Sequence, residues 1–330
     1  MTQHVLITGG CGFIGSNLVR FVLEHRPQWR VTNVDLLTYS GNRANLADLE
    51  GHPRYRFVHA DIRDRERMSA LVREADAVIH LAAESHVDRS IQDTRPFVST
   101  NVLGTQTLLD AAVDAARAGT FRRFVHVSTD EVYGSLPLER PQDRFTEDSP
   151  LRPSSPYAAS KAASDLLALA SHHTFGLDVV VTRCSNNFGA YQYPEKVIPL
   201  FVTNLIDGRK VPLYGDGLNV RDWIHVEDHA EAILAALERG RAGRVYNIGA
   251  DNEHANIELT RRLIALCGRD DSFIQPVADR LGHDRRYAID STRAAQELGW
   301  KASRSSWPQA LEATVRWYRD NERWWRPLKH

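Results

Sequence analysis

The chain has 330 residues, of which 42% are hydrophobic and 25% charged, and a formal net charge of −1. This composition suits a globular protein with an ample core, of about two domains or one enlarged domain. The near-zero charge, without a basic run, argues against nucleic acid or an anionic membrane as a partner. No apolar stretch approaches the ~20 residues of a membrane span, and the N-terminus shows no signal-peptide pattern.

The three cysteines are widely spaced and lack the spacing of a metal site. Their odd number favours a reducing compartment. We therefore expect a cytoplasmic protein without a bound metal.

Strand-like and helix-like segments alternate through the first half of the chain. Strands are predicted at 4–10, 30–35, 55–61, 77–83, 124–128 and 177–184, and helices at 13–25, 64–74, 96–118 and 155–175. This alternation predicts an α/β protein with a Rossmann-type doubly wound parallel sheet, helices on both faces and right-handed crossovers.

The pattern changes after residue 185, where prolines and glycines indicate loops around a short helix at 195–207. A helix at 226–240 and a strand at 244–249 indicate a return to the main sheet, and further helices are predicted near 256–267 and 308–320. We expect a Rossmann domain of residues 1–185, to which 220–250 return. Residues 186–219 and 251–330 are expected to form a smaller C-terminal α/β substrate-binding domain.

A glycine-rich turn, TGGCGFIG, joins the first strand to the first helix. It satisfies two spacings, GxGxxG with Gly10, Gly12 and Gly15, and GxxGxxG with Gly9 in place of Gly10. Glycines there let the backbone approach a pyrophosphate at the positive end of the helix. Asp35 ends the next strand, 20 residues after Gly15, where a carboxylate would bind an adenosine ribose and repel a 2′-phosphate. The turn therefore predicts NAD rather than NADP.

A second segment, FVHVSTDEVYG at 124–134, has two acidic residues directly after a strand. Carboxylates are costly to bury without partners, so Asp130 and Glu131 at the mouth of the core indicate a role. Consecutive residues of a regular strand point in opposite directions. We therefore predict that the strand has ended by Thr129, so that both acids face one cavity. A solvated turn with a helix cap is the alternative.

A third segment, SSPYAASK, places Tyr157 and Lys161 on one face of a helix. Ser155 is the expected N-cap and Pro156 the first helical residue. A free tyrosine has a pKa of ~10, and an ammonium about 4 Å away at an effective dielectric of about 20 would lower it by about three units. We therefore expect the ammonium of Lys161 to make Tyr157 a usable base.

These segments resemble the extended short-chain dehydrogenase/reductases, and more closely the dTDP-glucose 4,6-dehydratases. The resemblance covers nearly the whole chain. It includes TGGCGFIGSN, VDLLTYSGN, HLAAESHVDRSI, VSTDEVYG, SSPYAASK, RCSNNFGAYQYPEKVIPL, RDWIHVEDHA, YNIG, DRLGHDRRYAID and ELGW.

The resemblance implies a dehydration without net oxidation. Tyr157 takes the proton of the C4 hydroxyl of the sugar while hydride passes from C4 to NAD, and Thr129 hydrogen-bonds the C4 oxygen. Glu131 then removes the C5 proton made acidic by the 4-ketone, and Asp130 protonates the departing C6 hydroxyl. Hydride returns to C6, a proton enters at C5, and a 4-keto-6-deoxy sugar is left. Two neighbouring carboxyls serve if their environments push their pKa values apart.

The resemblance also assigns binding residues by motif. The cofactor set is Gly9, Gly12, Phe13, Ile14, Gly15, Asp35, Leu36, Leu37, Thr38, Asp61, Ile62, Leu81, Ala82, Ala83, Ser85, Thr100, Tyr157, Lys161 and Asn187. The substrate set is Ser85, Thr129, Asn186, Lys196, Val197, Ile198, Pro199, Leu200, Pro212, Leu213, Tyr214, Arg221, Asn256, Asp279, Arg280 and His283. Lys196 and Arg221 have the charge that a nucleotide diphosphate requires.

Two residues depart from the family pattern. Leu281 stands where proline is usual, which makes that loop less rigid, and Cys11 stands where alanine is more common. The family also implies a homodimer formed through the helices near 96–118 and 155–175.

Three alternatives remain open from the sequence. UDP-glucose would be the substrate instead of dTDP-glucose if the site ignores one methyl group, which is worth only about 1–3 kcal/mol. A sugar-nucleotide 4-epimerase or UDP-glucuronate decarboxylase would share Tyr157 and Lys161 but would not need both acids. A non-catalytic NAD-sensing protein would be expected to lose the tyrosine or the lysine.

Overall fold

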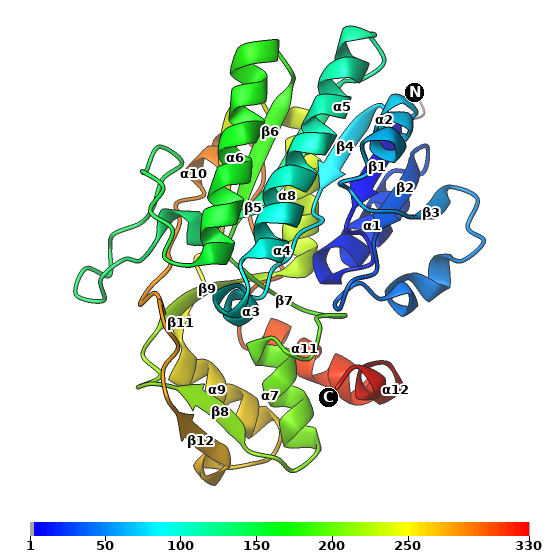
Figure 1. Cartoon of the computed structure of the whole chain (residues 1–330). Helices are drawn as coiled ribbons and strands as arrows, with labels where there is room; N and C mark the ends of the chain where they lie inside the picture. Colours follow the sequence, from blue (N-terminus) through cyan, green and yellow to red (C-terminus); the bar gives the residue numbers. More distant parts are fainter. Residues whose placement is uncertain (1–2, 330) are drawn as a thin grey trace.

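The computed structural model describes residues 3–329, and its central feature is a parallel sheet (Figure 1). Within these residues seven strands pair in the order β10-β6-β5-β4-β1-β2-β3. The strands are β1 (His4–Thr8), β2 (Arg30–Asp35), β3 (Tyr55–His59), β4 (Ala77–His80), β5 (Arg123–Thr129), β6 (Val179–Cys184) and β10 (Arg244–Ile248). The predicted doubly wound α/β fold is confirmed.

Alternating side chains of each strand enter two separate cores, because successive residues point to opposite faces of the sheet. Val5 and Ile7 of β1 belong to one core, whereas Leu6 between them belongs to the other. Helices α1 (Phe13–His25), α8 (Val226–Arg239) and α10 (Thr292–Leu298) cover the first face. Helices α2 (Arg65–Arg73), α5 (Thr105–Arg117) and α6 (Pro156–Phe175) cover the second, as Figure 1 shows for α5 and α6.

The helix predicted at 96–118 is continuous but not uniform. It begins as α4 (Arg95–Phe97), passes through a π-helical segment, η2 (Val98–Gly104), and continues as α5. Such segments are rare and often mark functional sites. Thr100 lies in this segment, next to the cavity described below.

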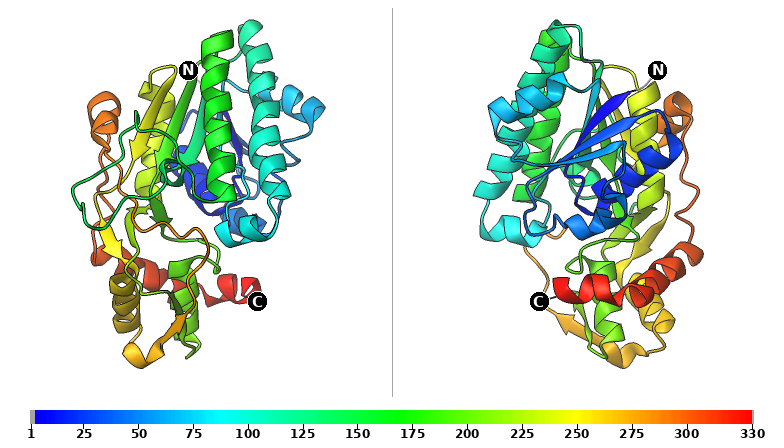
Figure 2. Two further views of the ribbon diagram at one scale, coloured as in Figure 1. Left: turned by 60° about the vertical axis from the view of Figure 1, so that its left-hand side comes forward. Right: turned by 90° about the vertical axis from the view of Figure 1, so that its right-hand side faces the viewer.

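A smaller layer lies against the carboxyl ends of the parallel strands (Figure 2). Its β structure consists of a three-stranded sheet, β11-β9-β7, and a two-stranded sheet, β12-β8. The strands are β7 (Asn186–Phe188), β8 (Val211–Tyr214), β9 (Val220–His225), β11 (Glu253–Ala255) and β12 (Ile274–Val277). The helices packed with them are α7 (Val197–Ile206), α9 (Asn256–Leu266), α11 (Gln309–Asp320) and α12 (Glu322–Trp325).

Short helical turns complete the chain between these elements. They are η1 (Arg43–Leu49), α3 (Val87–Gln92), η3 (Asp130–Tyr133), η4 (Asp271–Phe273) and η5 (Arg326–Leu328). Three predicted strands end at least two residues earlier than expected, β1 at Thr8, β3 at His59 and β4 at His80. The positive φ of Gly9, +73°, turns the chain out of β1.

The order of the strands reverses between β1 and β4, and open α/β sheets bind their ligands at this point. Across residues 3–329, none of the helices combines the length and the apolar character needed to cross a membrane.

Candidate active site

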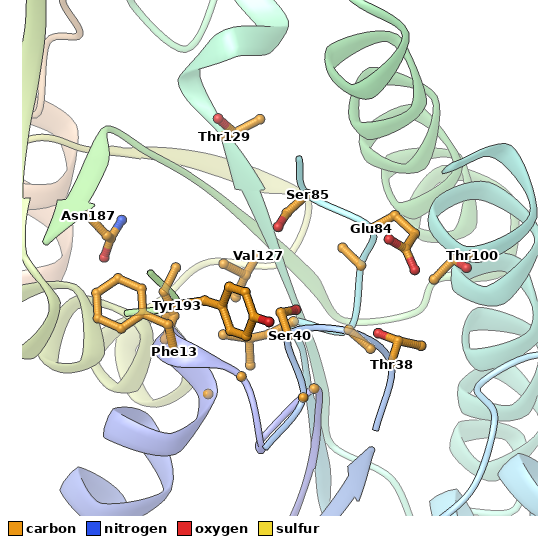
Figure 3. Close-up of a pocket in the computed structure, with 18 of the residues that line it drawn as sticks. Phe13, Thr38, Ser40, Glu84, Ser85, Thr100, Val127, Thr129, Asn187 and Tyr193 are labelled. Carbon is orange, nitrogen blue, oxygen red and sulfur yellow. The ribbon is translucent and has the colours of Figure 1, made fainter. Parts of the chain in front are cut away.

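A cavity of about 300 Å³ opens at the carboxyl ends of the parallel strands, between the large sheet and the smaller layer (Figure 3). Phe13 and Tyr193 lie together on one side of it, and Thr129 lies at the end of β5. Asn187 and Thr100 lie on opposite sides of the cavity, in the smaller layer and in η2. Residues from many segments of the chain thus converge on one space.

The glycine turn brings its backbone against this cavity. A Cβ added to Gly15 would lie 2.2 Å from the Gly9 carbonyl oxygen, and one added to Gly9 would lie 2.7 Å from the nitrogen of Ala82. Only glycine fits at these two positions, and Gly9 also has a positive φ. Helix α1 begins with Gly12 as a cap that makes no side-chain hydrogen bond. Its first N–H groups are therefore free to bind an anion in the cavity.

Asp35 ends β2 beside the glycine turn, as the spacing predicted. Its Oδ2 accepts the N–H of Cys11 at 2.9 Å and its Oδ1 accepts the N–H of Leu37 at 2.8 Å. Burial raises the pKa of this carboxyl, and the two backbone bonds oppose that rise. A fixed carboxyl acceptor on this wall fits the hydroxyls of a ribose.

The acid pair follows the end of β5 at Thr129, where the strand was predicted to stop. Asp130 and Glu131 open the turn η3, whose cap is the Thr129 hydroxyl accepting the N–H of Glu131 at 3.3 Å. Both acids line the cavity. The strand therefore gives way to a turn where both carboxyls must reach the same space.

The two acids have unequal environments. Burial raises the pKa of Asp130 well above its ordinary value, and the charges of Glu131 and Asp222 raise it further. Burial also raises the pKa of Glu131, but Arg280, Lys196 and Arg221 oppose this rise, in that order. Asp130 is therefore the better proton donor of the pair and Glu131 the better acceptor.

Tyr157 and Lys161 also line the cavity, from the first turns of α6. The predicted start of this helix is correct, because the Ser155 hydroxyl accepts the N–H of Ala158 at 3.1 Å and Pro156 is the first helical residue.

In this structure the pKa of Tyr157 is raised, whereas the sequence predicted that Lys161 would lower it. The Lys161 Nζ donates to the carbonyl oxygen of Val127 at 2.8 Å. Burial and the charge of Glu131 instead raise the pKa of Tyr157 well above its ordinary value, and a hydrogen bond with Thr129 opposes them. Burial lowers the pKa of Lys161 to about 8. The sequence placed both groups on one face but could not show that the ammonium turns to the backbone of β5.

Three cations approach the cavity from the smaller layer. Lys196 Nζ donates to the Ser85 carbonyl oxygen at 3.1 Å, and Arg221 Nη2 donates to the Asp284 carbonyl oxygen at 2.8 Å. Arg280 is 3.6 Å from a carboxyl oxygen of Asp88, and its buried Nε has no hydrogen-bond partner within residues 3–329. These cations are held mostly by backbone carbonyls, so their charge remains available to a bound anion.

The structure brings the five predicted catalytic residues to this cavity, together with the predicted cofactor residues other than Leu37. Leu37 has a positive φ, 56°, and packs against the core. Of the predicted substrate residues, Ser85, Thr129, Asn186 and Lys196 line the cavity. The others lie outside its lining: Val197, Ile198, Pro199, Leu200, Pro212, Leu213, Tyr214, Arg221, Asn256, Asp279, Arg280 and His283.

Several lining residues escaped the sequence prediction. They are Val34, Tyr39, Ser40, Gly41, Ala60, Glu84, Val127, Ser128, Cys184, Ser185, Gln192, Tyr193 and Glu195. Some of them, such as Ser128 and Cys184, lie within the last two residues of strands of the sheet, and that position could have indicated them. Others needed the tertiary structure, because the Arg89 guanidinium stacks 3.8 Å from the Tyr39 ring and also pairs with Glu195 at 3.4 Å.

Known proteins resemble this chain along its whole length. Residues 6–308 match the family model described as GDP-mannose 4,6 dehydratase. A dTDP-glucose 4,6-dehydratase from Streptomyces griseus is 56% identical over 330 residues, which cover 99% of this chain and 98% of that protein.

Solved structures agree with these sequence relatives. A dTDP-glucose 4,6-dehydratase from Streptomyces venezuelae, crystallised with NAD and TYD bound, is 54% identical with a TM-score of 0.94, covering 99% of this chain and 100% of that one. A UDP-glucose 4-epimerase from Thermotoga maritima, crystallised with UDP-glucose, is 29% identical with a TM-score of 0.86, covering 97% of this chain and 99% of that one. The fold is common to both, and the sequence is much closer to the dehydratase.

Proposed function

Since the chain belongs to the dTDP-glucose 4,6-dehydratase family, we propose that it converts dTDP-D-glucose to dTDP-4-keto-6-deoxy-D-glucose and water. The observation that carries the proposal is the acid pair. Asp130 and Glu131 share one cavity with Tyr157, and their environments separate a proton donor from a proton acceptor. An enzyme that only oxidises and reduces C4 has no need of this pair.

The cofactor is NAD, and the residues of the cavity fit it. Only glycine at positions 9 and 15 allows the neighbouring backbone segments to approach each other. The first N–H groups of α1 are free to bind phosphate, and Asp35 presents its carboxyl oxygens on the same wall of the cavity. NAD supplies a hydride acceptor for C4 and, at the end of the cycle, the hydride donor for C6. We assign its binding to the cofactor residues predicted above.

Tyr157 accepts the proton of the C4 hydroxyl, and Thr129 orients the C4 oxygen. The Thr129 side chain is among the groups that lower the pKa of Tyr157. Tyr157 can accept this proton only as the phenolate. Burial raises its pKa and opposes that form, so we propose that the positive charge of Lys161, one turn along α6, favours the phenolate.

Glu131 then removes the C5 proton, and Asp130 donates a proton to the departing C6 hydroxyl. The cations Arg280, Lys196 and Arg221 favour the charged form of Glu131. Asp130 is only 2% exposed, which favours its protonated form. Each acid therefore begins the elimination in the form that the step requires.

The smaller layer binds the nucleotide part of the substrate. The three cations suit its diphosphate, because guanidinium and ammonium groups make charge-assisted hydrogen bonds to phosphate. We propose the division expected from the sequence, with residues 1–185 and 220–250 holding the cofactor, and 186–219 and 251–330 holding the sugar nucleotide. The exception is β9, Val220–His225, which pairs in the smaller layer and carries Arg221 to the sugar nucleotide.

The protein is proposed to be a homodimer that forms through η2, α5 and α6. Val98, Leu103 and Leu166 are exposed on these neighbouring helices, at 51%, 57% and 58%. Exposed apolar side chains gathered in this way indicate an interface. Sedimentation of the wild type and of Leu166→Glu tests this, because a charge on the interface should release monomers.

A cytoplasmic location is proposed from the thiols. Cys11, Cys184 and Cys267 are all free, as expected in a reducing compartment. Fractionation of the source cells tests this.

The decisive experiment incubates the purified protein with dTDP-glucose and measures the alkali-induced chromophore of the 4-keto-6-deoxy product. Parallel reactions with UDP-glucose and GDP-sugars identify the preferred nucleotide. Product from dTDP-glucose at the highest kcat/KM supports the proposal. The absence of product from both dTDP- and UDP-glucose rejects a dehydratase, and an epimerised sugar would indicate the sister activity.

A further inference from the structure

Asp130 and Glu131 lie on a short turn that is not stable by itself. After Thr129 the chain makes the single turn η3, Asp130–Tyr133, and leaves it at Gly134 with a φ of +85°. One short 3-10 turn contributes few hydrogen bonds of its own and is unstable in isolation. The direction of the two carboxyls therefore depends on what holds the far end of the turn.

Tyr133 holds that end. Its side chain is 1% exposed, and its ring stacks on Phe145 with centroids 5.1 Å apart. Its hydroxyl donates to Asn247 Oδ1 at 2.7 Å and accepts from Arg183 Nη1 at 2.9 Å. Asn247 and Arg183 are directly paired residues of β10 and β6. The phenol is thus fixed to two neighbouring strands at once.

Arg183 continues the connection to the helix that carries Tyr157. Its Nε donates to Asp165 Oδ2 at 2.8 Å, with side-chain exposures of 3% and 0%. Asp165 lies on α6, one turn beyond Lys161. The other oxygen of Asp165 lies 3.3 Å from His126 Nε2. One buried chain, Asp165–Arg183–Tyr133, therefore joins the helix of the base to the turn of the acids.

A hydroxyl in this place needs an explanation beyond packing. The side chains around Tyr133 include Val132, Ala162 and Ile289, which would accept a phenylalanine equally well. Burying a hydroxyl costs free energy unless it makes hydrogen bonds. Hydrogen bonds also fix the position of the Tyr133 ring, which stacking on Phe145 alone would allow to shift. Tyr133 is not among the residues that line the cavity. It can act on the reaction only through the residues that do.

We propose that Tyr133 is a positioning residue for the elimination of water, and that its hydroxyl holds Asp130 and Glu131 in register with Tyr157. The proposal rests on the proposed function, because it needs the acid pair to carry the loss of water. Oxidation at C4 does not use the acid pair, so it should tolerate a movement of η3 that elimination does not.

The test is Tyr133→Phe, which keeps the ring on Phe145 and removes only the hydroxyl. On mixing with dTDP-glucose, reduced nicotinamide should form on the enzyme at the wild-type rate and then persist. Release of the keto product should slow by about 10- to 100-fold, the effect expected when reacting groups shift by a fraction of an ångström to about 1 Å. The ratio of the two rates is the readout, since a general loss of stability would not change it.

Tyr246→Phe is the matched control. Tyr246 is also fully buried on β10, and its hydroxyl donates to Glu297 at 2.8 Å and accepts the N–H of Arg241 at 3.1 Å. It lies outside the cavity lining. This variant loses a buried hydroxyl with two bonds as well, and it should keep the wild-type ratio of oxidation to product release.

Asn247→Ala removes the acceptor of the Tyr133 hydroxyl, together with the bond from Asn247 Nδ2 to the Phe145 carbonyl oxygen at 3.0 Å. Alone it should slow product release as Tyr133→Phe does, and the double variant should be hardly slower than either single one. If Tyr133→Phe does not fold, the two rates of Asn247→Ala are compared with those of the wild type instead.

Product release at the wild-type rate in both single variants would overturn the proposal, as would an equal fall of oxidation and release. A wild-type protein that makes no keto product would instead reject the dehydratase function itself. Unequal rates in Tyr133→Phe with an unchanged ratio in Tyr246→Phe establish the positioning role.

Discussion

The two ends of the cavity are built in different ways. At the sheet end, the glycine turn and Asp35 come from neighbouring strand ends within the first 35 residues. At the other end, Lys196 lines the cavity, and two further cations outside its lining, Arg221 and Arg280, come from separate segments of the second half of the chain. The first group is arranged by the topology of the parallel sheet. The second is assembled by packing of the smaller layer.

This difference separates two kinds of contribution. Groups on and next to the large sheet are held rigidly by strands and by α6, so they can be aimed at the reacting carbons. The cations of the smaller layer supply positive charge to a bound anion. When one of these cations is lost, a neighbouring cation can partly replace its charge. We therefore expect changes at the sheet end to stop chemistry and changes at the cation end to weaken binding.

The largest effect is expected for Tyr157→Phe. The variant loses the base of the oxidation, so kcat should fall by about 10³- to 10⁴-fold, the range of general acid–base catalysis. The content of bound NAD should remain that of the wild type, because the glycine turn is untouched. Steady-state kinetics and nucleotide extraction measure the two, and retained activity would contradict the role of Tyr157.

Asp130→Asn should break the chemistry one step later. Product release should fall by about 10²- to 10³-fold while reduced nicotinamide builds up on the enzyme, because asparagine cannot donate the proton. Normal turnover would show that another group protonates the C6 hydroxyl.

The same variant should gain stability. Because burial raises the pKa of Asp130, the folded protein keeps a proton that the unfolded chain releases, and this residue's contribution to stability falls as the pH rises from its ordinary pKa through the raised one. Asparagine removes this loss. Thermal unfolding at several pH values should show that the stability of the variant, relative to that of the wild type, increases as the pH rises. If the difference in stability between the variant and the wild type does not change with pH, the carboxyl of Asp130 is solvated and not buried.

Lys196→Met tests the cation end. We expect KM for dTDP-glucose to rise by about 10- to 100-fold, the worth of a charge-assisted hydrogen bond of about 1.5–3 kcal/mol, with a much smaller change in kcat. Lys210→Met, at an exposed lysine in the same layer, is the control and should leave KM unchanged. A fall in kcat with constant KM would move Lys196 to the chemical end of the comparison.

The smallest effect is expected for Leu281→Pro. Leu281 is 77% exposed in the loop that carries Arg280, and proline should stabilise the fold by about 0.4–1 kcal/mol by restricting the unfolded chain. Leu218→Pro is the contrast, because the N–H of Leu218 donates to Asp216 at 2.9 Å and its loss should destabilise. Destabilisation by Leu281→Pro would show that the loop needs a backbone angle that proline cannot adopt.

Most of the sheet end could be predicted because its signals are local. The glycine spacing, the acid at the end of β2 and the cap at Ser155 each lie within one strand–turn–helix unit, and the structure has all of them at the cavity or next to it. The end of β5 at Thr129 followed from two acids that had to share one space.

The rest depended on contacts between distant segments. The sequence could not show that Lys161 turns to the carbonyl of Val127, or that Arg89 contacts both Tyr39 and Glu195. Nor could it show which residues hold the phenol of Tyr133.

The sequence by itself determined the order of strands and helices, the glycine turn, and which residue types reach the carboxyl edge of the sheet, since strand alternation and helix capping act over a few residues. The tertiary structure alone decided the state of each catalytic group. The pKa values of Asp130, Glu131 and Tyr157 depend on burial and on charges brought from the other layer. Coulomb interactions and desolvation follow distance in space and not separation along the chain.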